Sequence, residues 1–179
     1  QILNPNDIAA TIHEAFHAAR EGRPGPVLVD IPKDVQAEMT NHSTSTRVQD
    51  HPSGHTRPAA EVLEAAATML NDAERPLFIV GHGVHLSQAW DQLRVMAEKA
   101  NVPVANTIHG TGAFPRRHPL ALGMLGMHGM YWSNMATAEA DLIIGIGMRF
   151  DDRVTGRPGT FAPNARIVHL EIEPRQVNK

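Results

Sequence analysis

Residues 141–156 read DLIIGIGMRFDDRVTG, and the first half of this stretch decides the fold class. Leu142 to Ile146 form a short apolar run with one glycine, which is typical of a strand buried on both faces of a parallel sheet. Beyond Gly147, two arginines bracket two aspartates. In open α/β sheets, ligands bind outside the carboxyl ends of the strands, where this loop would lie. We therefore predict a buried strand and a candidate binding loop; the alternative is a surface turn with solvated ion pairs.

Outward from this strand, apolar patterns of helical and strand type alternate from residue 58 onward. The patterns predict helices and strands over the following ranges: helices 58–71, 86–100 and 134–139, and strands 76–80, 102–105 and 167–170. Strands that alternate with helices favour a parallel sheet with right-handed crossovers. The predicted fold class is therefore α/β, a Rossmann-like parallel sheet flanked by helices, preceded by the tail of another α/β domain.

The first 40 residues predict a helix that begins at Asn4-Pro5, followed by a short strand over 27–31. Within the helix, residues 13–17 match H-E-x-x-H, the zinc-protease pattern. These polar residues lie opposite the apolar stripe of the helix, and arginines occupy the later positions of the extended motif. We therefore favour a solvated helix face and predict no metal site. Residues 41–57 are rich in Ser, Thr, His, Pro and Gly, which predicts a linker between domains.

Composition narrows the function classes. The chain has 179 residues, 42% hydrophobic and 20% charged, with a formal net charge of -3. This balance is ordinary for a globular protein and gives no reason to expect nucleic acid or an anionic membrane as a partner. The absence of cysteine excludes disulfides and thiolate chemistry. No apolar run is long enough for a membrane span, and the N-terminus does not resemble a signal peptide. Because the chain begins at Gln1, we expect a piece of a longer polypeptide.

Glycine-containing or charged loops follow four of the predicted strands, at residues 81–83, 107–110, 147–153 and 171–173. In a parallel sheet these loops would share one edge. Gly81-His82-Gly83 would let backbone amides approach a diphosphate, although the third glycine of G-x-G-x-x-G is missing. Glu171 is placed like the carboxylate that accepts ribose hydroxyls in such folds; an exposed helix-start carboxylate explains it equally well.

Residues 123–130 read GMLGMHGM, with three glycines among three methionines and a leucine. Such a run gives a bendable backbone and polarizable side chains, which suit packing against a flat ring system. The alternative, a helix start whose methionines belong to the core, is equally compatible with the sequence.

Three motifs in order, GRPGPVLVDIPKDVQ at 22–36, GMLGMHG at 123–129 and GMRFDDRVTG at 147–156, closely resemble acetohydroxyacid synthases (acetolactate synthases). These thiamine-diphosphate enzymes open branched-chain amino-acid synthesis. The resemblance covers essentially the whole chain. It implies that residues 1–40 end the N-terminal pyrimidine-binding domain and that 58–179 form an incomplete central FAD-binding domain, joined by the linker 41–57.

The resemblance also implies roles for individual residues. FAD contacts are expected from Arg23, Gly81, His82, Gly83, Thr107, Ile108, Leu125, Gly126, Met127, His128, Gly147, Met148, Arg149, Phe150, Asp151, Asp152, Arg153, Glu171 and Ile172. The substrate channel is expected to involve Lys33, Met127, Asp152 and Arg153. His82 departs from the family pattern, which usually has Gly or Ala there, and 106–117 is less typical of the family.

In the family, pyruvate is decarboxylated on thiamine diphosphate and joined to a second 2-oxo acid, with FAD largely structural or regulatory. The catalytic glutamate and the magnesium–diphosphate motif are missing here, so we expect thiamine diphosphate and Mg²⁺ only in the full-length enzyme and no activity from this chain alone. The resemblance further implies homodimers or tetramers, a regulatory small subunit and a bacterial cytoplasm. Alternatives are a related carboligase or decarboxylase, such as glyoxylate carboligase or oxalyl-CoA decarboxylase, and a free-standing nucleotide-binding regulatory module. A Rossmann dehydrogenase is disfavoured by the missing third glycine.

Overall fold

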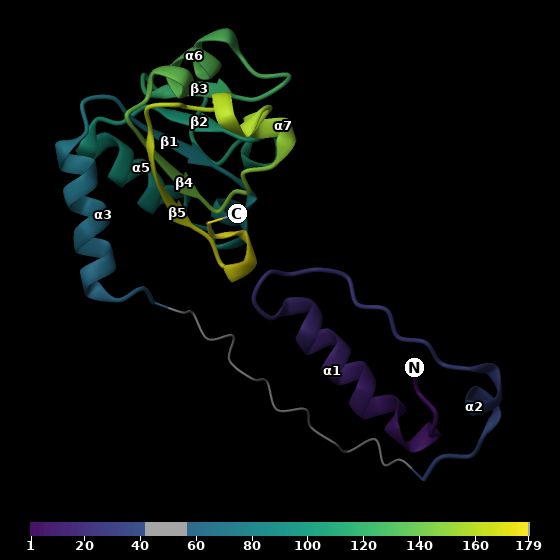
Figure 1. Ribbon diagram of the computed structural model, residues 1–179. Helices are drawn as coiled ribbons and strands as arrows, with labels where there is room; N and C mark the ends of the chain where they lie inside the picture. The colour runs from purple at the N-terminus through teal and green to yellow at the C-terminus, as the bar shows by residue number, and fades with distance from the viewer. Residues whose placement is uncertain (42–56, 179) are drawn as a thin grey trace. The chain divides into compact units, whose positions relative to one another are not determined.

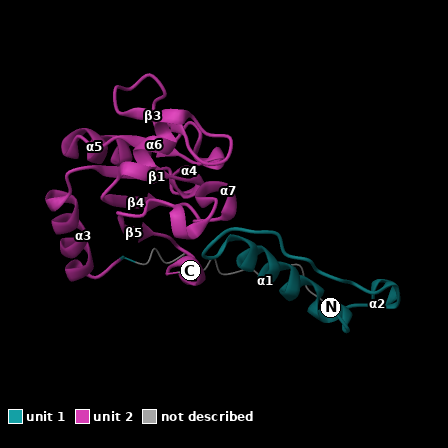
Figure 2. Cartoon of the chain, turned by 45° about the horizontal axis from the view of Figure 1, so that its top comes forward, with its two compact units in different colours: residues 1–57 teal, residues 58–179 magenta. Residues whose placement is uncertain are grey.

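A computed structural model describes residues 1–41 and 57–178, which fall into two compact units, 1–57 and 58–179 (Figure 2). Residues 42–56 of the expected linker lie outside the described residues. The family resemblance divides the chain at nearly the same point, although the assignment of the first unit to a pyrimidine-binding domain stays a prediction.

The larger unit is built on a five-stranded, fully parallel sheet (Figure 1). Its strand order is β3-β2-β1-β4-β5, so the chain reverses its direction of travel across the sheet between β1 and β4. The strands are β1 (Pro76–Val80), β2 (Val104–Asn106), β3 (Ala121–Met124), β4 (Leu142–Ile146) and β5 (Arg166–Leu170). The α/β prediction is confirmed, and the central strand β1 and its neighbour β4 are the strands that the apolar runs 76–80 and 142–146 predict.

Helices cover both faces of this sheet. They are α3 (Ala60–Asp72), α4 (His82–Leu86), α5 (Trp90–Ala100), α6 (Tyr131–Glu139) and α7 (Asp152–Thr155). Alternate residues of β1 point to two separate cores. Phe78 packs on one side with residues of α3, α4 and α5, whereas Ile79 packs on the other with residues around α7. Figure 1 shows α3 and α5 on one side of the sheet and α6 and α7 on the other.

Several predicted bounds in this unit are wrong; the helix expected at 134–139, for example, begins at Tyr131. The helix expected over 86–100 begins later, since Leu86 ends α4, α5 begins at Trp90, and Gln88 between them has a positive φ of 54°. The strand expected at 102–105 is displaced to β2, since Val102 and Pro103 complete the turn after α5. A further difference is β3, a strand that the sequence pattern does not predict. Its Gly123, at φ 81°, and its four half-buried residues lack the apolar signal of the central strands.

The smaller unit contains α1 (Ile8–Arg20) and α2 (Lys33–Ala37), with a 3₁₀ turn at Pro5–Asp7 before α1. Asn4 caps that turn through a hydrogen bond that its side chain accepts from the Asn6 amide, 2.9 Å. The strand predicted at 27–31 is wrong. The described part of this unit supplies no strand to pair with it, and Leu28 is 92% exposed. A parallel or antiparallel ladder needs a neighbouring strand, so the apolar run alone forms no regular ladder, although the Asp30 carbonyl accepts a hydrogen bond from the Ile2 amide, 2.9 Å.

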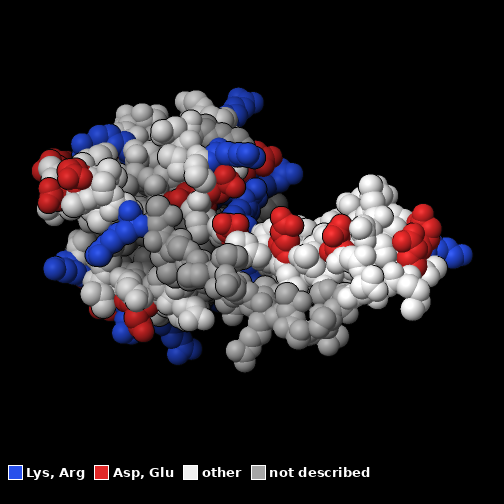
Figure 3. All heavy atoms as spheres, turned by 90° about the horizontal axis from the view of Figure 1, so that it is seen from below, with Lys and Arg blue, Asp and Glu red and all other residues white. Residues whose placement is uncertain are grey.

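The H-E-x-x-H helix face carries exposed His13 and Glu14, while the half-buried His17 lies 3.5 Å from Glu21. Among the described residues, no group of three or more histidine, aspartate or glutamate side chains is placed to hold a metal ion. Within the same residues, no helix is long and apolar enough to cross a membrane. On the face drawn in Figure 3, basic and acidic side chains are interspersed.

Asp141 joins the amino ends of three strands. Its carboxylate accepts hydrogen bonds from the Glu74 and Arg75 amides, 2.7 and 2.9 Å, just before β1. Its carbonyl accepts one from the amide of Arg166, the first residue of β5, 2.9 Å. The Glu74 amide above all, then the Arg75 amide, holds the pKa of this carboxyl below its ordinary value despite an opposing desolvation effect. Its ionised form is therefore the form that the fold stabilises.

A lowered pKa predicts how stability depends on pH. The contribution of Asp141 is present above its ordinary pKa and is lost as pH falls through its lowered value in the folded protein. We expect Asp141→Asn to destabilise the fold at pH 7 and to flatten the loss of stability between neutral and acidic pH. Urea unfolding at several pH values measures both effects, with exposed Asp91→Asn as the matched control. Equal pH slopes in wild type and Asp141→Asn would contradict the prediction.

Candidate functional site

The parallel sheet brings the predicted loops to one edge. Val80, Asn106 and Ile146 are register partners at the ends of β1, β2 and β4, and Met124 and Leu170 extend this row to β3 and β5. The segments that follow these strands therefore lie along a common edge, which we call the carboxyl rim. From β3 to β5 it consists of residues 125–128, 107–110, 81–83, 147–153 and 171–173. Ligands of open α/β sheets bind at such a rim, next to the reversal of strand order.

At the centre of the carboxyl rim, three glycines pack backbone against backbone. The Gly81 amide donates to the Ile146 carbonyl and the Gly83 amide to the Gly147 carbonyl, each at 2.9 Å. A Cβ at Gly83 would lie 2.6 Å from the Gly147 Cα, and Gly147 itself has a φ of 57°. Both Gly81 and Gly83 amides are thus used within the protein. The close approach of β1 and β4 explains the Gly-His-Gly sequence. Because the Gly81 and Gly83 amides already donate to carbonyls of the protein, they do not support the predicted contact with a diphosphate.

The two family-like loops, 125–128 and 147–153, contact each other. The Met127 amide donates to the Arg153 carbonyl, 3.0 Å, and a Cβ at Gly126 would collide with that same carbonyl. Asn134 of α6 holds the loop from the other side. Its Oδ1 accepts from the Gly126 amide, 2.8 Å, and its Nδ2 donates to the Gly126 carbonyl, 3.0 Å. The role of Asn134 is not predictable from the sequence, because an asparagine in a helix carries no signal of the loop that it fixes.

A cavity of about 330 Å³ opens beside these two loops. Its walls come from the 126–127 turn, α6, α7 and the segment before β5, and are mainly apolar. The lining residues are Gly126, Met127, Asn134, Thr137, Ala138, Asp152, Val154, Thr155, Gly156, Thr160, Phe161 and Ala162. Met127 and Asp152, predicted for the substrate channel, therefore border one cavity. Arg23 and Lys33, also predicted for the site, are exposed residues of the smaller unit.

The charged loop after β4 is balanced internally. Arg149 lies 3.7 Å from Asp151, and Arg153 lies 3.5 Å from Asp152. The Asp151 side chain also caps α7 by accepting from the Arg153 amide, 3.2 Å. Both ion pairs are long and partly or largely exposed, and such pairs contribute little to stability. The arginines can therefore exchange these carboxylates for an anionic ligand at low cost.

Not every predicted contact residue offers its side chain to the carboxyl rim. Met148 is 3% exposed and Leu125 is 4% exposed, so a ligand could reach them only through the main chain. The Thr107 hydroxyl accepts from the Gly110 amide, 3.2 Å, as a cap. By contrast, the side chains of Ile108 and Ile172 are well exposed, as are His82 and His128.

Glu171 has a structural task already. Its Oε1 accepts hydrogen bonds from the Ile172 and Glu173 amides, 3.0 and 3.2 Å, and so fixes the turn after β5. This favours the capping interpretation of the two left open by the sequence. The same contacts hold the carboxylate at the carboxyl rim, where Oε2 takes no part in them.

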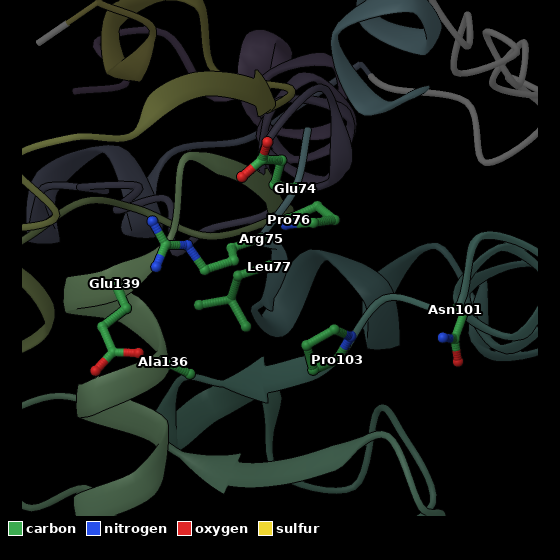
Figure 4. Close-up of a pocket in the computed structure, with 8 residues that line it drawn as sticks. All are labelled: Glu74, Arg75, Pro76, Leu77, Asn101, Pro103, Ala136 and Glu139. Carbon is green, nitrogen blue, oxygen red and sulfur yellow. The ribbon is translucent and has the colours of Figure 1, made fainter. Parts of the chain in front are cut away.

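A second cavity of about 330 Å³ lies at the opposite, amino edge of the sheet. Figure 4 shows Leu77, Pro76 and Pro103 in its wall, with the side chains of Arg75 and Glu139 extending beside them. None of the family-like loops contributes to it. The cavity beside α7 is the one that combines the sequence motifs with the carboxyl rim.

Comparison with known proteins gives the same family. Residues 63–179 match the model of the central domain of thiamine pyrophosphate enzymes. The acetolactate synthase large subunits of Parasynechococcus marenigrum and Corynebacterium glutamicum are each 44% identical over 99% of this chain. Acetolactate synthase 1 of rice chloroplasts is also 44% identical over 99% of the chain. The chain spans 29%, 29% and 28% of these relatives, less than a third of their length.

Among solved structures, a candidate thiamin diphosphate-dependent enzyme from Mycobacterium smegmatis matches with a TM-score of 0.70. The match has 24% identity and covers 98% of this chain and 33% of the other, so it supports the fold alone. The family match, by contrast, covers well over half of the chain and includes every strand of the sheet. The chain therefore belongs to the thiamine pyrophosphate enzyme family, and its larger unit is the central domain of that family.

Proposed function

We propose that this chain is the FAD-binding central region of an acetolactate synthase large subunit. In this proposal the longer protein decarboxylates pyruvate on thiamine diphosphate and condenses the product with a second 2-oxo acid. The observation that carries the proposal is the meeting of the 125–128 and 147–153 loops beside one cavity at the carboxyl rim. The identity of 44% with acetolactate synthase large subunits over nearly the whole chain supports the choice of reaction.

The residues of the carboxyl rim fit a flavin adenine dinucleotide in three respects. Arg149 and Arg153 offer guanidinium groups for a diphosphate once their ion pairs with Asp151 and Asp152 are broken. Exposed Met127, with Phe161 and Val154 in the cavity wall, provides apolar and polarizable surface for a flat ring. Glu171 keeps one carboxylate oxygen outside its turn contacts for a ribose hydroxyl.

Thiamine diphosphate, when bound to the whole enzyme, would supply the carbanion chemistry. We expect this chain to contribute the flavin site and part of the substrate channel, where Met127 and Asp152 border the cavity. The roles of Arg23 and Lys33 in the same site remain part of the proposal. So do assembly into homodimers or tetramers, a regulatory small subunit, Mg²⁺ and a cytoplasmic location.

Flavin binding by the chain itself tests the first half of the proposal. We expect FAD titrated into the protein to show saturable quenching of flavin fluorescence and a shifted visible absorption band. ADP should compete, because it carries the adenosine and diphosphate portions, whereas riboflavin should bind much more weakly. Binding of ADP without any preference for FAD would instead favour a related decarboxylase that uses another nucleotide. Absence of saturable binding by any of these would contradict the nucleotide site altogether.

The second half of the proposal is tested in the longer protein that we expect to contain this chain. Acetolactate formation from pyruvate should depend on added thiamine diphosphate and Mg²⁺. Removal of FAD should abolish activity, and in the FAD-loaded protein the flavin should stay oxidised during turnover, because the reaction has no net redox step. A protein that binds FAD but forms no acetolactate from pyruvate would contradict the proposed reaction without contradicting the proposed flavin site.

A further inference from the structure

His169 of β5 makes a short hydrogen bond to the loop after β4. Its Nε2 lies 2.7 Å from the Met148 carbonyl oxygen, in a partly buried position. A carbonyl only accepts, so Nε2 carries the proton and donates. The peptide between Met148 and Arg149 is therefore oriented by a side chain from the neighbouring strand. Nothing in the sequence around His169 predicts this contact.

Ring contacts hold the same loop. The His169 ring meets Phe150 edge-to-face, with centroids 5.1 Å apart, and Phe150 meets Phe161 in the same way at 6.0 Å. Gly145 of β4 leaves the space that Met148 and Phe150 occupy, since a Cβ there would lie 3.1 Å from both side chains. Met148 and Phe150 thus fold back toward the sheet, while Arg149 between them is exposed.

We propose that His169 is a positioning residue that presents Arg149 to an anionic ligand at the carboxyl rim. Its hydrogen bond fixes the 148–149 peptide, and the fixed peptide keeps Arg149 on the outer side of the loop. Among the described contacts, the Arg149 side chain has a long, half-exposed ion pair with Asp151, which contributes little, so the placement of Arg149 relies on the backbone that this bond helps to fix. The identity of the ligand as FAD rests on the proposed function; the ordering of the loop does not.

Two variants separate the hydrogen bond from the ring packing. His169→Phe keeps an aromatic ring against Phe150 but removes the donor, whereas His169→Gln loses the ring and keeps an amide donor of similar reach. His118→Phe is the matched control, because His118 is also partly buried, contacts Phe114 edge-to-face and hydrogen-bonds Glu98, far from the loop after β4. Two readouts are required: amide hydrogen exchange of residues 147–153 without ligand, and FAD affinity by fluorescence quenching.

We expect His169→Phe to speed exchange in 147–153 and to weaken FAD binding, each by about tenfold, the factor for a hydrogen bond worth about 1.4 kcal/mol. His169→Gln should restore both values to within about threefold of wild type, and His118→Phe should change neither. The proposal is overturned if His169→Phe leaves loop exchange unchanged, or if His169→Gln behaves like His169→Phe. Failure of wild type to bind FAD would overturn the proposed function, while the exchange comparison would still decide the role of His169.

Discussion

Replacement of Gly147 by alanine is expected to remove a large part of the stability of the larger unit. A Cβ at Gly147 would lie 2.6 Å from the Gly83 Cα, and the residue has a φ of 57°. The positive φ costs alanine about 1–2 kcal/mol and overpacking about 1–3 kcal/mol, so roughly 2–5 kcal/mol in all. Domains have only about 5–15 kcal/mol of stability. Because the colliding atoms are backbone, they cannot turn away, which favours the upper end.

Alanine variants of two other glycines distinguish the cost of a positive φ from the cost of a steric collision. Gly156 has a φ of 61° with no atom within 4 Å of its would-be Cβ, and Gly159 has open space without a positive φ. In urea unfolding, Gly159→Ala should be nearly neutral, Gly156→Ala moderately destabilising and Gly147→Ala severely so. A midpoint for Gly147→Ala equal to that of Gly156→Ala would show that the close approach of β1 and β4 is not rigid.

Removing both arginines of the charged loop should have the largest effect on ligand binding. We expect Arg149→Ala with Arg153→Ala to weaken FAD binding by about a hundredfold or more, because each guanidinium–phosphate contact is worth about 1.5–3 kcal/mol. The salt dependence of binding should fall as well, since two cations are lost. Thermal stability should change little, because both arginines make long and exposed ion pairs.

The control is a double variant of equal charge change at the opposite edge. Arg75 precedes β1 and Arg166 begins β5, so Arg75→Ala with Arg166→Ala removes two cations from the amino edge of the sheet. This control should keep FAD affinity at moderate salt. Equal weakening in both double variants would mean that overall charge, rather than contact at the carboxyl rim, drives binding.

The sequence was most informative where burial is complete. The apolar runs 76–80 and 142–146 predicted β1 and β4 with their observed bounds, because strands buried on both faces need apolar residues throughout. It failed where tertiary contacts override local pattern. β3 lies at the edge of the sheet with Gly123 in a positive φ, and the break at Gln88 divides a pattern that is continuous in sequence. At 27–31 the apolar run predicted a strand, but the described part of the smaller unit contains no strand that could pair with it.

The candidate site was predicted in part. The shared edge of the loops follows from parallel pairing, which the βα alternation indicated correctly. The structural role of Gly81 and Gly83 could not be predicted, because a glycine required by a neighbouring backbone looks the same in the sequence as a glycine required by a ligand. Asn134 and His169 were missed for a related reason: each acts on a loop far away in sequence, through contacts that only the fold creates.

The contact among Gly81, Gly83 and Gly147 also limits how this protein can change. Where a side chain presses on a side chain, a second mutation can trim the neighbour and restore the fit. Here each partner is already the smallest residue, so a selection for suppressors of Gly147→Ala should yield no compensating change at the other two positions. Suppressor mutations would have to stabilise the protein elsewhere, because no substitution within this glycine contact can relieve the collision.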